Sequence, residues 1–155
     1  MTTIEDAKKE LRSNFLKGTK CPCCGQFVKQ YRRKLNSGMA RTLIKVYNHH
    51  KQNEVNVKQF LRVHGFQNNH DWTILRYWGL IEELPNKSDG KTKTSGVWKI
   101  TDKGVYFVNN SLTLPSHVLI YNKVFMGYDG KEIDIIQALG KHFNYYELMN
   151  NNHNA

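Results

Sequence analysis

The chain has 155 residues, a length that fits one domain with appendages. Hydrophobic residues (39%) and aromatic residues (12%) suffice for a core, and the formal net charge of +10 favours a polyanionic partner. No apolar run approaches the roughly 20 residues that a membrane span needs, and the N-terminus has no apolar stretch typical of a secretory signal. We therefore expect a cytoplasmic protein without a membrane partner.

Residues 1–36 are expected to form a helix, a tight cysteine loop and a basic segment. Thr3 can cap the helix, which should stop at Gly18. Three cysteines follow within four positions, an odd and clustered set that makes a poor disulfide framework and favours a reducing compartment. Residues 26–35 mix apolar and basic side chains, and their pattern fits either a strand or a short helix.

The cysteine loop contains Cys21-x-x-Cys24-Gly25, which resembles the first half of a zinc ribbon. Cys21 and Cys24 are thus the candidate zinc ligands, and zinc is the candidate cofactor. A structural zinc ion needs four ligands, and the sequence has no second C-x-x-C pair. A metal could bridge two subunits, or the turn could hold no metal, or it could be a reactive thiol turn. The histidines that could otherwise complete the site are His49, His50, His64 and His70.

Residues 37–110 show three short helical segments followed by two strands around a Lys-, Ser- and Gly-rich loop. Ser37, Asn56 and either Asn68 or Asn69 are the expected N-caps of the helices. The strands are expected at residues 80–84 and 97–101, and Asp102-Lys103-Gly104 closes the second strand. This order resembles the winged helix-turn-helix domains of bacterial and phage regulators. The resemblance implies a helix that enters the DNA major groove and a hairpin, the wing, that touches the backbone.

The third helical segment, residues 70–78, provides the side chains that would read DNA. Ile74, Leu75 and Trp78 are expected to face the core. Arg can pair with guanine, Asn with adenine, and Thr can meet a thymine methyl group. The opposite face carries Asn69, His70, Thr73, Arg76 and Tyr77. This face could also be merely solvated.

Basic residues in the wing and before the first of these helices would contact phosphates. Lys87, Lys91 and Lys93 belong to the wing, where each could release about one counterion. Residues 21–58 hold eight Lys or Arg residues and one Glu, a net charge of +7. We expect a positive ridge there that fixes the register on the duplex, or else a solvated surface. Its members are Lys29, Arg32, Arg33, Lys34, Arg41 and Lys45.

Residues 111–155 are expected to form a strand and a helix. Residues 117–128 are rich in β-branched and aromatic side chains, with a break near Asn122. Asp129-Gly130 is typical of a turn. Apolar residues then recur at helical spacing, which predicts either one helix broken around Gly140 or two short helices.

The sequence therefore predicts an α+β fold. It would have a winged helix-turn-helix core at 37–110, an N-terminal helix and knuckle at 1–36, and a strand-helix extension at 111–155. No nucleotide-binding loop, metalloprotease motif or nucleophile elbow occurs, so we do not expect an enzyme. The predicted function is binding of double-stranded DNA by a small transcriptional regulator or a phage accessory protein.

Two other functions stay open. The chain could be a protein-interaction module, such as a phage protein that binds a host polymerase or a defence complex, with Trp72, Tyr77 and Trp98 as its interface. It could also bind single strands or RNA by aromatic stacking. A homodimer is expected because winged-helix regulators often read two half-sites. Its surfaces would be the first helix and the segment with Ile133, Ile136, Leu139 and Phe143.

Overall fold

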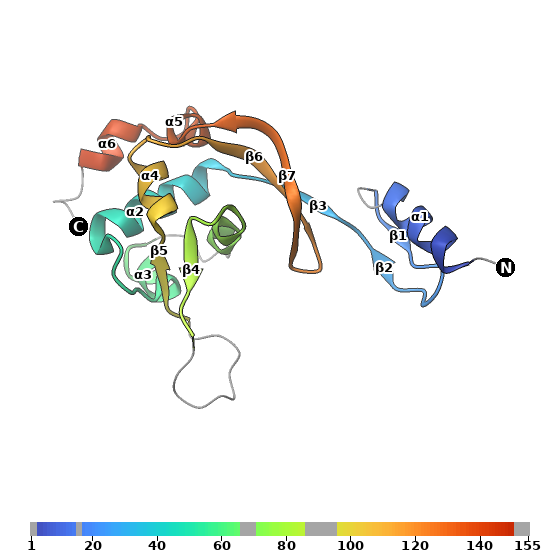
Figure 1. Ribbon diagram of the computed structural model, residues 1–155. Coiled ribbons are helices and arrows are strands. Elements are labelled where there is room, and N and C mark those ends of the chain that lie inside the picture. The colour runs from blue at the N-terminus through green and yellow to red at the C-terminus, as the bar shows by residue number, and fades with distance from the viewer. Residues whose placement is uncertain (1–2, 15–16, 66–70, 86–95, 151–155) are drawn as a thin grey trace.

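The computed structural model describes residues 3–14, 17–65, 71–85 and 96–150. Its mixture of helices and sheets confirms the predicted α+β class (Figure 1). The helices are α1 (Ile4–Asn14), α2 (Ser37–His50), α3 (Val57–Val63), the 3-10 helix η1 (Asp71–Trp78), α4 (Asp102–Val108), α5 (Ile135–Leu139) and α6 (Tyr145–Asn150). The strands are β1 (Thr19–Lys20), β2 (Phe27–Val28), β3 (Tyr31–Lys34), β4 (Ile81–Glu83), β5 (Trp98–Ile100), β6 (Leu114–Tyr121) and β7 (Val124–Ile133).

Helix α2 lies at the centre of the core. Its buried side chains include Leu43 and Ile44, and it packs against η1, α4, α5 and α6. The cap of this helix is Asn36 rather than the expected Ser37, since the Asn36 side chain accepts a hydrogen bond from the Met39 amide at 2.9 Å. One apolar cluster runs from Leu35 to Leu148. The residues that were expected to form separate middle and C-terminal parts therefore share one core.

A small antiparallel sheet sits on α2 and η1. Strands β4 and β5 pair from Ile81 with Ile100 to Glu83 with Trp98. Val55, which lies between α2 and α3, joins them through a bridge to Trp98. The Val55 amide donates to the Trp98 carbonyl at 2.9 Å, and the Trp98 amide returns the bond at 2.8 Å. The segment between the first two helices of this region thus pairs with the last strand.

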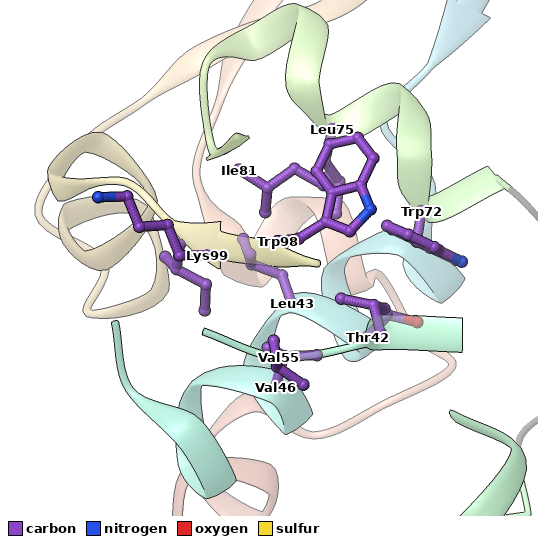
Figure 2. Close-up of a pocket in the computed structure, with 11 residues that line it drawn as sticks. Thr42, Leu43, Val46, Val55, Trp72, Leu75, Ile81, Trp98 and Lys99 are labelled. Carbon is purple, nitrogen blue, oxygen red and sulfur yellow. The ribbon is translucent and has the colours of Figure 1, made fainter. Parts of the chain in front are cut away.

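The two tryptophans under this sheet belong to the core. Trp72 and Trp98 are each 5% exposed, and their rings meet edge to face with centroids 5.2 Å apart. Figure 2 shows them beside a mainly apolar cavity of about 10 Å³, which is too small for a ligand. The expectation that Trp72 and Trp98 form a protein interface is wrong, because burial makes them unavailable to a partner.

The residues after β5 open a helix instead of only closing a strand. The Thr101 hydroxyl accepts from the Gly104 amide at 3.1 Å, which caps α4, and it donates to the Gly79 carbonyl. A side chain at Gly104 would collide with the Leu80 carbonyl oxygen and the Ile100 side chain. The Thr-x-x-Gly pattern therefore lets α4 pack directly on the backbone between η1 and β4.

A three-stranded antiparallel sheet, in the order β3-β6-β7, forms the other part of the fold. Residues 31–34 are a strand, which settles one of the alternatives for the basic segment, and they pair with residues 117–120 of β6. Strands β6 and β7 are joined by Asn122 and Lys123, whose φ angles of 49° and 65° suit a two-residue hairpin turn.

The turn expected at Asp129-Gly130 is wrong. Both residues lie within β7, near a register irregularity in β6 between Pro115 and His117. Gly130 has a φ of +84°, and a side chain there would overlap Ser116. The glycine therefore serves a bulge and a close strand approach rather than a chain reversal.

The C-terminal residues form two short helices, α5 and α6, rather than one. Asp134 caps α5 with a reciprocal pair of hydrogen bonds to Gln137. Leu139 is fully buried, and Ile133, Ile136 and Phe143 pack against the same core. This segment is therefore not the free dimer surface that the sequence suggested.

The N-terminal elements stand apart from this body. In Figure 1, α1, β1 and β2 lie to one side, and β3 leads from them to the rest of the chain. The Asp6 amide donates to the Thr3 hydroxyl at 3.1 Å, as the expected cap requires. Across the residues that the structure describes, no helix combines the length and the apolar character needed to cross a membrane.

Candidate nucleic-acid interface

An open groove of about 340 Å³ lies between η1, β3 and the turn that joins β6 to β7. It brings together three of the predicted residues of the third helix, Thr73, Arg76 and Tyr77, with Arg33 from the basic segment. The remaining lining residues are Tyr31, Ile74, Ile120, Asn122 and Lys123. Three cations from three different elements therefore meet at one surface.

The 3-10 geometry of η1 sets which side chains face this groove. In a 3-10 helix, residues three apart lie on the same side. Trp72, Leu75 and Trp78 are accordingly the buried residues, and Trp78 also donates its indole N–H to the Pro115 carbonyl at 2.7 Å. Arg76 is left exposed on the surface. Asn69 and His70, which were predicted to read bases, lie outside the described residues.

Tyr77 holds the hairpin turn against η1. Its hydroxyl donates to the Lys123 carbonyl at 2.9 Å and accepts from Arg76 Nη2 at 2.8 Å. The Arg76 guanidinium carbon lies 4.8 Å from the centroid of the Tyr77 ring. Tyr128 adds a hydrogen bond of 3.3 Å to the Tyr77 carbonyl. Tyr77 is thus best described as a residue that positions Arg76 and Lys123.

Strand β3 divides the predicted basic ridge between the two faces of its sheet. Tyr31 and Arg33 line the groove, whereas Arg32 and Lys34 alternate to the other face. Arg33 Nη2 lies 3.0 Å from Asp71 Oδ1, an exposed pair that fixes the side chain more than it stabilises the fold. The expectation of one continuous ridge is therefore wrong.

Arg32 is tied to β7 on the face opposite the groove. Arg32 Nε contacts Asp129 Oδ2 at 2.6 Å. This hydrogen bond, together with the Gly130 amide, lowers the pKa of Asp129. Burial and the positive charges of Arg32 and Lys34 lower the pKa of His117, although Asp129 opposes the effect. Arg32 is thus held on β7, outside the residues that line the groove.

The two cations predicted on α2 lie in a different place. Arg41 and Lys45 line a separate cavity of about 290 Å³ with Phe143 and Glu147 of the C-terminal segment. The Arg41 guanidinium carbon lies 4.8 Å from the centroid of the Phe143 ring. The wing lysines Lys87, Lys91 and Lys93 fall outside the described residues. The structure describes only β4 and β5, the strands before and after them.

Three groove residues were missed from the sequence: Tyr31, Asn122 and Lys123. Their contribution depends on pairing between β3 and β6, two strands that lie far apart in the chain. A local signal did exist, since Asn122-Lys123 separates two runs rich in apolar residues, as the turn of a hairpin does. The pattern indicated only a break in one strand.

Histidines cluster at the junction of α2 and α3. The His49 and His64 ring centroids are 4.6 Å apart, and both rings pack on Phe60. Burial is the main cause that lowers the pKa of His49 from its usual 6.5, followed by the positive charges of His64, His50 and Lys45. The folded protein therefore disfavours protonation of His49.

We expect the free energy of unfolding to fall as the pH decreases from 7 toward 5. The lowered pKa of His49 means that the unfolded chain binds more protons once the pH drops below about 6.5, and His117 acts in the same direction. His49→Gln should therefore reduce the difference between urea midpoints at pH 7 and pH 5. His142→Gln, at an exposed position, serves as the control. An unchanged difference in the His49 variant would contradict this assignment.

Cys21 and Cys24, the predicted zinc ligands, lie between β1 and β2 and are not among the residues that line the groove. Within residues 3–14, 17–65, 71–85 and 96–150, no group of three or more His, Cys, Asp or Glu side chains could hold a metal ion. Zinc binding therefore stays a prediction, and the two thiols supply half of a tetrahedral site.

Comparison of the chain with models of protein families, with curated proteins and with solved structures gives no match. The functional argument thus depends on the residues of the groove.

Proposed function

We propose that this chain binds double-stranded DNA through the groove beside η1, in the manner of a winged helix-turn-helix protein. The order of α2, α3, η1, β4 and β5 supports this fold. The bridge from Val55 to Trp98 supports it further, because it adds the segment between the first two helices to the β4–β5 pair. The biological role would be that of a small transcriptional regulator or a phage accessory protein.

The observation that carries the proposal is the convergence of Arg33, Arg76 and Lys123 on one open groove. Guanidinium and ammonium groups on a shared surface suit a run of phosphates, and phosphate contacts position a protein on its duplex. Arg76 is exposed on η1, and its planar donors also match the acceptors of guanine in the major groove. The lysines at 87, 91 and 93 would extend the same contacts along the backbone.

The test is fluorescence anisotropy of the full chain with a labelled random-sequence duplex and the matching single strand. Contacts from Arg76 and Lys123 alone predict a salt slope of about −1.8, so affinity should fall at least about 12-fold between 50 and 200 mM salt. Absence of duplex binding by the folded protein at low salt would refute the proposal. Tighter binding of the single strand than of the duplex would favour the stacking function instead.

One observation favours the second function, a protein-interaction module. Strand β7 carries exposed apolar side chains, with Val124 57% exposed and Phe125, Met126 and Tyr128 each 43% exposed. Exposed apolar patches of this kind are typical of protein interfaces. Capture of a host polymerase subunit by the wild-type chain, lost in Phe125→Ser without any change in duplex binding, would support this function.

A further inference from the structure

The cysteine turn has the geometry of a metal-binding knuckle. It joins β1 to β2, which pair from Thr19 with Val28 to Lys20 with Phe27. The Cys21 amide donates to the Gln26 carbonyl at 2.7 Å, and the Gly25 amide donates to the Cys21 carbonyl at 2.8 Å. Gly25 has a φ of +76°, which glycine adopts without strain. The two bonds close the loop and bring Cys21 and Cys24 together.

Backbone amides within the loop are aimed at sulfur. The Cys24 amide and the Cys23 amide both point at the Cys21 sulfur, so the loop offers hydrogen-bond donors to a sulfur that holds a metal. All three cysteines are free, and Cys23 and Cys24 are exposed.

We propose that Cys21 and Cys24 bind one zinc ion together with the same two thiolates of a second copy of this chain. The resulting four-thiolate site would join two chains through their knuckles. Tetrahedral coordination by four cysteines is a common arrangement for structural zinc.

Two thiols fill half of a tetrahedral zinc site, so two further ligands come from elsewhere. Within the described residues of one chain, which leave out the candidate His70, the His, Cys, Asp and Glu side chains form no group of three that could hold a metal. Two copies of an exposed two-thiol knuckle, related by a twofold axis, supply four ligands without any further residue.

The thin packing of the N-terminal elements also points to a metal-linked pair. Within residues 3–14 and 17–28, the buried apolar side chains are Ala7 and Val28, whereas Ile4 is 69% exposed and Phe27 is 60% exposed. So little apolar burial does not hold a unit of this size by itself, and small units commonly use a metal or a partner chain. A structural zinc ion contributes directly to folding.

The charges around the knuckle fit this centre. Lys17 and Lys20 are exposed beside it in the chain, and Lys29 follows β2. Without a metal, these lysines would oppose the approach of two knuckles. A zinc ion with four thiolates carries a net charge of −2, which offsets the lysines of both copies.

The experiment measures zinc content and molar mass of the full chain on the same sample. We expect one zinc ion for every two chains by elemental analysis, a dimer by light scattering, and a monomer after chelation. Cobalt in place of zinc should give the absorption spectrum of a tetrahedral thiolate site. Cys21→Ser and Cys24→Ser should each lose the metal and the dimer, whereas the matched variant Cys23→Ser should keep both.

Three outcomes would overturn the proposal: a folded chain that binds no zinc, one zinc ion on a monomer, or a zinc-dependent dimer that survives Cys24→Ser. Circular dichroism of each variant establishes that the helices around α2 remain folded. The groove and the knuckle are separate, so duplex binding by a metal-free monomer would leave the proposed function intact while it refutes this site.

Discussion

Replacement of both Arg76 and Lys123 by Gln is expected to weaken binding of a random duplex about 60-fold at 0.1 M salt. Two phosphate contacts contribute about −1.8 to the slope of log affinity against log salt. At 0.1 M salt, one decade below the 1 M reference, their loss therefore lowers the affinity about 60-fold. Both side chains line the groove beside η1, and neither carries an ion pair among those found in the described residues. Anisotropy titrations at several salt concentrations measure both the affinity and the slope.

The matched control replaces Lys131 and Lys141 by Gln. These two lysines are exposed and lie outside the groove. Their replacement lowers the net charge of the chain by the same amount as the replacement of Arg76 and Lys123. The control should retain most of the affinity. Equal weakening in the two double variants would show that overall charge, and not this groove, attracts the duplex. Arg76 also donates a hydrogen bond to the Tyr77 hydroxyl, so its replacement could disturb the fold. Circular dichroism of both double variants checks that they remain folded.

Trp98→Ala should lower the free energy of unfolding by about 3–5 kcal/mol, which is typical for the loss of a buried tryptophan. Trp98 is 5% exposed, packs on Trp72, and contributes the backbone that binds Val55. The substitution would enlarge the cavity in Figure 2 at the junction of α2, η1 and the β4–β5 pair. A loss of this size is a large fraction of the stability of a typical domain.

Urea titration of Trp98→Ala and of Tyr106→Ala measures this effect. Tyr106 is an aromatic residue of α4 that is 59% exposed, so its removal should change the midpoint little. Trp98→Phe should fall between the two, because it keeps part of the packing. A midpoint in Trp98→Ala equal to that of the wild type would contradict the assignment of Trp98 to the core.

The local elements could be predicted because their signals are local. Apolar spacing and the Asn56 cap indicated α3, whose first-turn amide at Gln59 donates to Asn56 at 3.0 Å. Apolar runs bounded by Gly and Pro indicated β4, and the break near Asn122 lay at the true hairpin turn. The interpretation of Asp129-Gly130 as a turn failed, since strand pairing with β6 places these residues inside β7.

The candidate site could be predicted only in part, for the same physical reason. Thr73, Arg76 and Tyr77 follow from the apolar pattern of one short segment, and the structure places all three at the groove. Tyr31 and Lys123 join them only through tertiary pairing. An α-helical period left the side of Trp72 open, whereas η1 has three residues per turn and buries Trp72 together with Leu75 and Trp78.

The pairing of β3 with β6 also determines when this protein can fold during its synthesis. Tyr31 pairs with Ile120, so β3 stays without its neighbour until most of the chain has left the ribosome. Contacts that span such a long loop form slowly, whereas the β4–β5 pair needs only the residues between two nearby strands. A nascent chain that ends before Leu114 therefore has an unpaired basic strand, and Arg33 can take its place in the groove only after β6 has been synthesised.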